Sequence, residues 1–427
     1  MLASAASPIS RPHRDLTRCL RVFQAYRFLS TSYLFVPVFL LFFSSRGLSL
    51  TEITLLNTVY SGTLILFEVP TGVLADRCGR KWAMVLGSSL MAAGCLVDFA
   101  GHSFVAFAAG EGLLALGMTL SSGADSAYLY DLLRAAGREA EYRRWEGSAS
   151  AAKLVGTAVA LVLGGWLARR DVSITYVATA AVCVVAALLA ALLEERPVAF
   201  ATPRPLRAQI ASSARAVLTH PPLLFAVLFS TLVFTLVRMS LYLHQPYLTR
   251  AGFAIEEVGL VLGGLSLLGA WGAHGIDRLR RILGERGLVV GVPAALALSY
   301  LVLGHWVASW GIALLLVQSV LNGVYSPLSK ELLNREILDS GQRATILSVE
   351  SMSRRIAFGL FAPLCGAMMD RYGLGGGLHV CAALGLIGVV WLVGRPVRRL
   401  ARRRAIANCA APASLDNVRL AKLPREG

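Results

Sequence analysis

The sequence predicts an all-α polytopic membrane protein whose two pseudo-symmetric six-helix bundles surround a central cavity. Three observations support this fold class. The 427 residues are 56% hydrophobic and 15% charged, with a mean hydropathy of +0.63, outside the range of soluble globular proteins. The apolar residues gather into twelve runs, each suited to a bilayer core that needs about 20 residues per helix. The chain also contains an internal repeat.

The twelve runs follow one another as two sets of six. A longer polar segment near the middle of the chain separates the first six runs from the last six, so the chain divides into two halves with equal numbers of helices. The predicted spans are 20–45, 51–75, 82–101, 103–131, 146–168 and 174–193, then 222–249, 256–275, 287–305, 309–334, 344–369 and 376–394.

Arginine and lysine alternate between loops as the positive-inside rule describes. The net charge of +16 is concentrated in segments such as that holding Arg77, Arg80 and Lys81, whereas predicted outer loops hold few cations. This placement argues against nucleic acid as a partner and predicts cytoplasmic termini in the inner (cytoplasmic) membrane. The predicted domains are a cytoplasmic tail (1–19), an N-terminal bundle (20–193), a cytoplasmic linker (194–221), a C-terminal bundle (222–394) and a basic cytoplasmic tail (395–427). The stretch RRLARRR in that tail either anchors the topology or binds anionic lipid.

A shift of the sequence by 201 residues aligns three landmarks of the two halves. It superposes the pair at 76–77 on the pair at 277–278, both Asp-Arg, and it also aligns Gly165 with Gly366 and Arg170 with Arg371. Coincidence at three separate places indicates duplication of a six-span unit.

The stretch GVLADRCGRK, residues 72–81, lies between the second and third predicted spans. It resembles the loop signature GxLADRxGRR/K of the major facilitator superfamily (MFS), at the position where that family carries it. The resemblance implies a twelve-span transporter of the drug or metabolite efflux-like branch. The fifth-span stretch GTAVALVLGG, residues 156–165, departs from the exporter signature, because Ala160 and Leu161 replace its central Gly-Pro.

The loop itself is predicted to act as a conformational latch that closes the cytoplasmic side. Glycine permits close backbone approach and tight turns, and charged side chains can form breakable pairs. Asp131 is the expected partner of Arg77 or Arg80, and Arg354 or Arg355 that of Asp76. The alternative is that the cations only enforce topology. The predicted latch consists of Gly72, Asp76, Arg77, Gly79, Arg80, Lys81, Asp131, Arg354 and Arg355.

Ionisable residues inside spans are costly and are therefore candidates for proton coupling. Arg27, Glu68 and Asp125 lie at matched depth, so that one arginine can serve two carboxylates. Glu111, Ala115, Met118, Ser122 and Asp125 follow a helical spacing that places them on one face of a continuous fourth span. The predicted coupling residues are Arg27, Glu68, Asp125 and Glu111.

Polar and aromatic residues on the first, fourth, seventh and tenth spans are predicted to contact the solute, because the resemblance implies that these spans line the cavity. Gln318, Asn322 and Tyr325 recur at i, i+4 and i+7, although Gln318 and Asn322 can equally join helices. The predicted substrate residues are Tyr26, Tyr33, Met118, Ser122, Arg238, Gln245, Gln318, Asn322 and Tyr325, with Asn57, His244 and Tyr247 as additions.

The function predicted from these features is proton-coupled efflux of a small organic solute by alternating access. A proton- or sodium-coupled importer and a transporter-like sensor or lipid-handling protein remain as alternatives. The seven cysteines form no CxxC pair, and no nucleotide-binding or hydrolase motif is present in a suitable context, so neither an enzyme, a metal site nor a cofactor is expected. The expected partners are a small-molecule solute, H+ or Na+, and membrane lipid, with the protein as a monomer.

Overall fold

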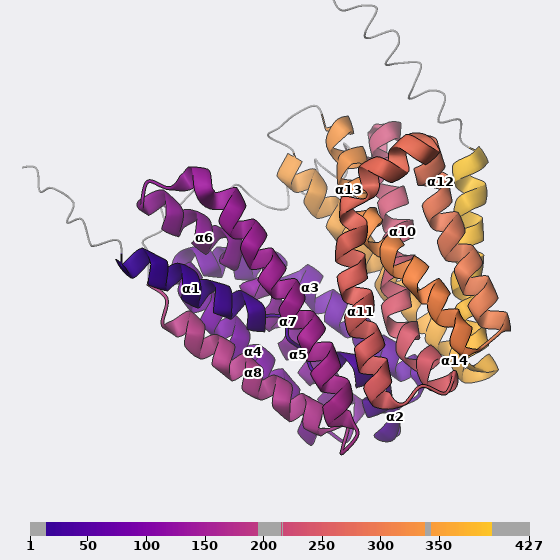
Figure 1. Cartoon of the computed structure of the whole chain (residues 1–427), viewed down its shortest axis with the longest axis horizontal. Coiled ribbons are helices and arrows are strands. Elements are labelled where there is room, and N and C mark those ends of the chain that lie inside the picture. Colours follow the sequence, from indigo (N-terminus) through magenta and orange to yellow (C-terminus); the bar gives the residue numbers. More distant parts are fainter. Residues whose placement is uncertain (1–13, 195–214, 216, 338–342, 395–427) are drawn as a thin grey trace, which may run out of the picture.

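The computed structural model describes residues 14–194, 215, 217–337 and 343–394, and every regular element in this part of the chain is helical. Ten of these helices are long and apolar enough to cross a membrane. Figure 1 shows two helical bundles side by side, with α1 to α8 in one and α10 to α14 in the other. The predicted C-terminal tail and most of the predicted N-terminal tail and linker lie outside the described residues, whereas residues 14–19 of the predicted N-terminal tail belong to the first helix.

The first bundle contains the six spans of the N-terminal half, two of which are broken. Short 3₁₀ turns (η) occur before α2 and before α7. The elements are α1 (Arg14–Leu29), η1 (Val36–Val38), α2 (Phe39–Ser45), α3 (Leu50–Cys78), α4 (Arg80–Ala100), α5 (Phe104–Ser121), α6 (Ala124–Ala135), η2 (Glu139–Glu141), α7 (Tyr142–Ala168) and α8 (Ile174–Ala191).

The second bundle is built from longer helices with two sharp internal turns. Gly284 and Gly373 have φ values of 69° and 70°, a backbone conformation that glycine adopts without strain, and each joins two helical segments. The turn at Gly373 separates the predicted eleventh and twelfth spans. The elements are α10 (Pro221–Arg250), α11 (Ile255–His274), α12 (Ile276–His305), η3 (Ser309–Gly311), α13 (Ile312–Glu336) and α14 (Arg343–Gly394).

The prediction of a continuous first span over 20–45 is wrong, because the chain leaves the helix between Leu29 and Val36. Ser30 and Ser32 donate their hydroxyl hydrogens to carbonyls of the preceding turn. Pro37 then restricts the backbone at the start of η1. The buried N–H of Leu34 donates to Thr179 Oγ1 of α8 at 3.0 Å, which satisfies a backbone group that lipid could not.

The prediction of a continuous fourth span over 103–131 is also wrong. The helix ends at Ser121, and Gly123 takes a φ of 86° before α6 begins. Residues on α5 and α6 therefore do not follow one helical register. The predicted common face of Glu111 and Asp125 does not exist as a continuous stripe.

The two bundles contact each other closely at the end of the molecule opposite the 72–81 loop, which we call the closed end. Asp370 of α14 accepts hydrogen bonds from the Leu50 and Thr51 amides, both at 2.9 Å, and from the Thr51 hydroxyl at 2.6 Å. Arg169 at the end of α7 forms a 3.4 Å ion pair with Glu256 at the start of α11. Both contacts join the end of one span to the beginning of a span in the other half.

Glycines allow this contact between the bundles. Gly165 of α7 and Gly259 of α11 lie backbone to backbone, and a Cβ on either would meet the other helix at 2.6–2.7 Å. Gly366 of α14 packs in the same way against the Leu50 carbonyl of α3. The glycines aligned by the internal repeat thus occupy equivalent places in the interface.

Candidate solute-binding site

A cavity of about 490 Å³ lies between the two bundles. This volume falls within the usual range for sites that bind small organic molecules. Its lining includes five of the predicted substrate residues, namely Tyr33, Met118, Arg238, Gln245 and Asn322, together with Glu111, Asn57 and His244. Both halves of the chain therefore supply the walls.

Aromatic rings form much of the cavity wall. Tyr33 stacks on Phe35 with ring centres 5.9 Å apart, and Phe39 contacts Tyr242 of the other half edge to face, also at 5.9 Å. Tyr60 lines the same space. A planar or apolar part of a solute can pack against these rings.

The cavity carries one acidic and one basic side chain from opposite halves. Glu111 of α5 is 4% exposed, and its Oε1 has no hydrogen-bond partner among the described residues. Arg238 of α10 lies over the Tyr242 ring, 5.6 Å from its centre. Glu111 and Arg238 form no ion pair with each other among the described residues, so both side chains are available to a ligand.

Neutral polar groups complete the lining. The Tyr242 hydroxyl donates to Asn57 Oδ1 at 2.5 Å, a hydrogen bond between the halves. His244 Nε2 lies 2.8 Å from Gln318 Oε1, and Gln318 donates to Ser299 Oγ at 2.8 Å. Because Gln318 Oε1 can only accept, His244 carries its hydrogen on Nε2, and its Nδ1 is left as an acceptor without a partner among the described residues.

Four predicted substrate residues do not line the cavity. Tyr26 is fully buried in the first bundle and packs on Phe23, and Ser122 is exposed where α5 ends. Gln318 lies behind His244, which it orients. Tyr325 bonds to Ser230 and to Arg354 inside the second bundle. The structure therefore places these four side chains away from the cavity wall, because helical spacing gives a face but not which neighbour that face meets.

Arg27 forms a charge cluster in the first bundle. It makes an ion pair with Asp125 of α6, as predicted, and a second at 3.4 Å with Glu146 of α7, which also accepts from Ser126 Oγ at 3.0 Å. The side chain of Glu68 is exposed on α3, so its predicted place in this cluster is wrong. Glu146 takes that place. Glu146 is the first residue of the predicted fifth span, where a charged side chain is ordinary, so the sequence did not mark it as a candidate.

The 72–81 loop shows one expected contact, since Arg80 Nε lies 2.8 Å from Asp131 Oδ2. Gly79 has a φ of 95° and makes the tight turn between α3 and α4, as predicted. Gly72 makes no close backbone contact in this conformation, because no atom lies within 4 Å of where its Cβ would be. Arg77 is exposed and Lys81 lies over the Trp82 ring.

The predicted pairing of Asp76 with Arg354 or Arg355 is also wrong in this conformation. Asp76 lies 3.7 Å from Arg80 of its own half. Arg354 pairs with Glu350 at 2.9 Å and lies over the Phe234 ring. Arg355 is partly buried on the same helix. The bundles are thus joined at the closed end, while these charges pair within their own halves.

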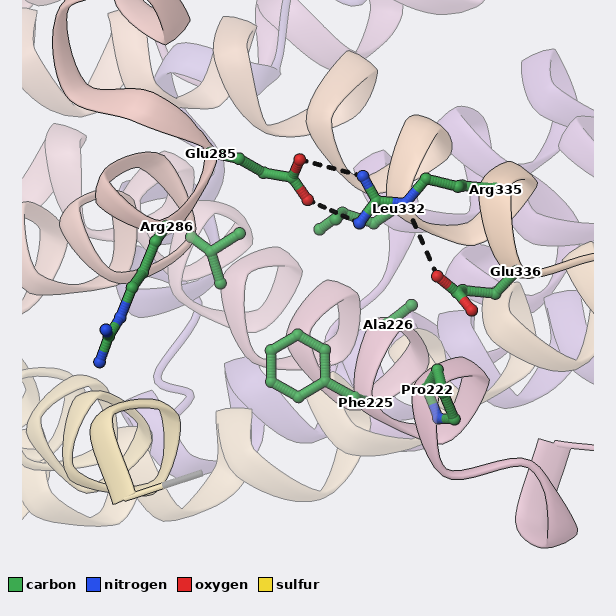
Figure 2. A pocket seen from close by; sticks show the side chains of 9 residues that line it. Pro222, Phe225, Ala226, Glu285, Arg286, Leu332, Arg335 and Glu336 are labelled. Atoms are coloured by element: carbon green, nitrogen blue, oxygen red, sulfur yellow. Dashed lines mark hydrogen bonds and ion pairs between the residues drawn. The ribbon is translucent and has the colours of Figure 1, made fainter. Parts of the chain in front are cut away.

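A second hollow in the C-terminal bundle is too small to bind a solute. It holds about 20 Å³, roughly the space of one water molecule, between α10, α12 and α13. Figure 2 shows Arg335 donating to both oxygens of Glu285, at 3.0 and 2.6 Å, with Glu336 on its other side. This hollow beside an ion pair does not offer room for a solute, whereas the cavity between the bundles does.

A helical membrane protein whose two halves enclose a solute-sized cavity is a carrier of the secondary-transporter class. The family model of the Major Facilitator Superfamily matches residues 28–337, so the chain belongs to this family. The resemblance inferred from the 72–81 loop is therefore confirmed for the family. The protein is a multi-pass integral membrane transporter of a solute.

Solved structures of this fold are similar over nearly the whole chain. A mutant of the nucleoside transporter NupG aligns with a TM-score of 0.77 and 12% identity, covering 89% of this chain and 99% of that one. A bacterial homologue of the human lysosomal transporter Spinster, in an inward-facing conformation, aligns at 0.68 and 15%, covering 90% and 96%. At sequence identities this low, the similarity to these structures shows a common fold and not a common solute. No curated protein sequence matches this chain.

Proposed function

We propose that this transporter exports a small amphipathic organic solute in exchange for protons. The observation that carries the proposal is the cavity between the halves, where Glu111 and Arg238 face one aromatic-walled space without pairing with each other. The rings suit the apolar part of a solute, and the two charges suit a cationic or zwitterionic group. Both halves hold the solute, so it can pass from one side to the other when they rock.

Coupling is assigned to the carboxylates of the first bundle. Arg27 is shared by Asp125 and Glu146, whose side chains are 13% and 24% exposed. One cation facing two carboxylates leaves one negative charge that a proton can neutralise. A proton moving through about 100 mV supplies about 2.3 kcal/mol, which drives export without ATP.

The direction of opening follows from the charge distribution. If cation-rich loops face the cytoplasm, the closed end lies outside and the cavity is reached from the cytoplasm. This state would load a solute for export. We further propose that the Arg80–Asp131 contact belongs to the latch on the cytoplasmic side, with its partners in the other half engaged after rocking.

The test is solute-dependent proton flux in proteoliposomes that contain an internal pH dye. The full chain would be challenged with cationic, anionic and neutral aromatic solutes under an imposed pH gradient. We expect a cationic or zwitterionic solute to move protons in the wild type. Asp125→Asn and Glu111→Gln should each reduce the flux at least tenfold, equivalent to about 1.4 kcal/mol.

Glu68→Gln is the matched control, because it removes an exposed carboxylate that neither lines the cavity nor pairs with Arg27. Equal loss of flux in this variant would show that the effect is non-specific. Solute movement that ignores the pH gradient but follows a sodium gradient would overturn proton coupling, and accumulation in the same direction as the proton would overturn export.

A further inference from the structure

A buried aspartate near the end of α4 has no role in the proposed transport cycle so far. Asp98 is 0% exposed, and neither of its carboxylate oxygens has a hydrogen-bond partner among the described residues. Placing an unpaired ionised carboxylate in such surroundings costs several kcal/mol. A group of this kind needs either a bound cation or a proton.

Asp98 lies directly against the residue that precedes Glu111. A Cβ at Gly110 would overlap the Asp98 carboxyl group, so the glycine leaves the space that this side chain occupies. Glu111, the next residue of α5, faces the cavity. The two carboxyl groups interact electrostatically, with Glu111 on the cavity wall and Asp98 packed between α4 and α5.

A third unpartnered polar group comes from α8. Tyr176 is 0% exposed, its hydroxyl has no hydrogen-bond partner in the described part of the chain, and it interacts electrostatically with both carboxyl groups. The buried Cys95 thiol of α4 also interacts electrostatically with Asp98 and Glu111. The hydroxyl and thiol can donate hydrogen bonds to a carboxylate, but they bring no positive charge.

The remaining titratable neighbours approach Glu111 from across the cavity. Tyr60 of α3 and Tyr242 of α10 interact with it electrostatically. Arg238 lies in the same cavity over the Tyr242 ring, and Arg46 donates to the Phe99 and Gly101 carbonyls just after Asp98. Among the described residues, neither arginine forms an ion pair with Asp98 or Glu111. The carboxyl pair is thus left without a neutralising side chain.

We infer that Asp98 and Glu111 form a proton-binding carboxyl pair in which Glu111 faces the solute cavity and Asp98 lies behind it. The inference rests on the proposed function for its role in transport. Two neighbouring carboxyl groups in one buried site do not both ionise readily, so the empty pair holds a proton. Asp98 acts as a positioning residue, because it fixes the second carboxyl group of the pair behind Glu111 and out of contact with solvent.

This arrangement assigns the solute to the organic cations. When a protonated amine enters the cavity, the Glu111 O–H bond breaks, the proton leaves to water in the cavity, and the Glu111 carboxylate pairs with the ammonium group. One positive charge replaces another, so the buried charge is unchanged. Release of the amine on the other side leaves the carboxylate to take up a proton there.

The test is a pH titration of the full chain in lipid nanodiscs, read by the infrared band of protonated carboxyl groups. We expect the wild type to keep a protonated-carboxyl signal at pH 7, and Glu111→Gln and Asp98→Asn each to remove part of it. In Asp98→Asn, the signal that remains from Glu111 should disappear at a pH lower by at least about one unit, as expected for two coupled sites. Glu68→Gln is the control and should leave the titration unchanged.

A wild-type protein with no protonated-carboxyl signal at pH 7 would overturn the inference, even if a variant failed to fold. So would a signal that neither substitution alters. Replacing choline chloride by sodium chloride at fixed pH provides another arm, and loss of the signal there would assign the pair to Na+ instead. Because the titration needs no solute, it can succeed while coupled flux fails, or fail while flux persists, which separates this inference from the proposed function.

Discussion

Single charged residues carry most of the functional information in this transporter. Arg27, Asp125 and Glu111 stand out in the sequence because ionisable groups are rare and costly inside apolar spans. The structure joins Arg27 to Asp125 and places Glu111 on the cavity wall. Glu146 and Asp98 lie near the ends of their spans, where a charge is ordinary, so the sequence did not separate them from solvated residues.

Removing the Arg27 cation should destabilise the first bundle. Arg27→Gln leaves Asp125 and Glu146 in a largely buried site without their positive partner, which typically costs about 3 kcal/mol. A lower midpoint in thermal unfolding of the detergent-solubilised protein would report this loss. The double variant with Asp125→Asn should recover part of it, because the uncompensated charge is removed. Additive effects of the two substitutions would contradict a direct interaction.

Twelve spans are predicted from the sequence, whereas the described residues form ten helices long and apolar enough to cross a membrane. The predicted first span is broken, and the predicted eleventh and twelfth spans form one element, α14. Apolar runs separated by charged loops mark spans, because hydrocarbon excludes charge. The breaks after Leu29 and at Gly123 fall within such runs, where hydropathy does not change. They depend on hydroxyl-to-carbonyl bonds, a proline and one left-handed glycine. For this reason the predicted polar stripe on the fourth span failed while the spans themselves were recovered.

The turn between α3 and α4 should depend on Gly79 and not on Gly72, which lies inside α3. Gly79→Ala places a Cβ on a backbone with φ of 95°, which should cost about 1 kcal/mol of stability. Gly72→Ala is the matched control, since its Cβ would meet no atom within 4 Å and alanine favours a helix. Thermal unfolding of both variants would test this. Equal losses would show that the turn conformation is unimportant.

At the scale of the whole molecule, the duplication visible in the sequence becomes two equivalent interfaces. Gly165 and Gly366, aligned by the 201-residue shift, both bring a helix end close to a helix of the other half. The sequence could indicate this symmetry but not the conformation. Which end closes depends on a small free-energy difference between two packings of the same surfaces.

Weakening the closed end should shift the transporter toward the opposite opening. Asp370→Asn keeps the shape of the side chain but removes the negative charge that accepts from Leu50 and Thr51. Spin labels at Ser45→Cys and Tyr372→Cys, in a background without native cysteines, should show a larger population of long distances in this variant. Asp171→Asn is the control, because among the described residues this carboxylate accepts a hydrogen bond from the nearby Ser173 amide and joins no residue of the other half. An unchanged distance distribution would contradict a gating role for Asp370.

The Asp370 contact also ties the order of one helix to the position of the other half. The first amides of α3 donate to two different acceptors. The Glu52 amide donates to Ser49 Oγ of the same half, whereas the Leu50 and Thr51 amides donate to Asp370 across the interface. When the halves separate at this end, those two amides lose their acceptor and meet water. Their hydrogens should therefore exchange with deuterium at a rate set by how often the transporter opens. Hydrogen exchange at the first turn of α3 would thus report the opening frequency of the unlabelled protein.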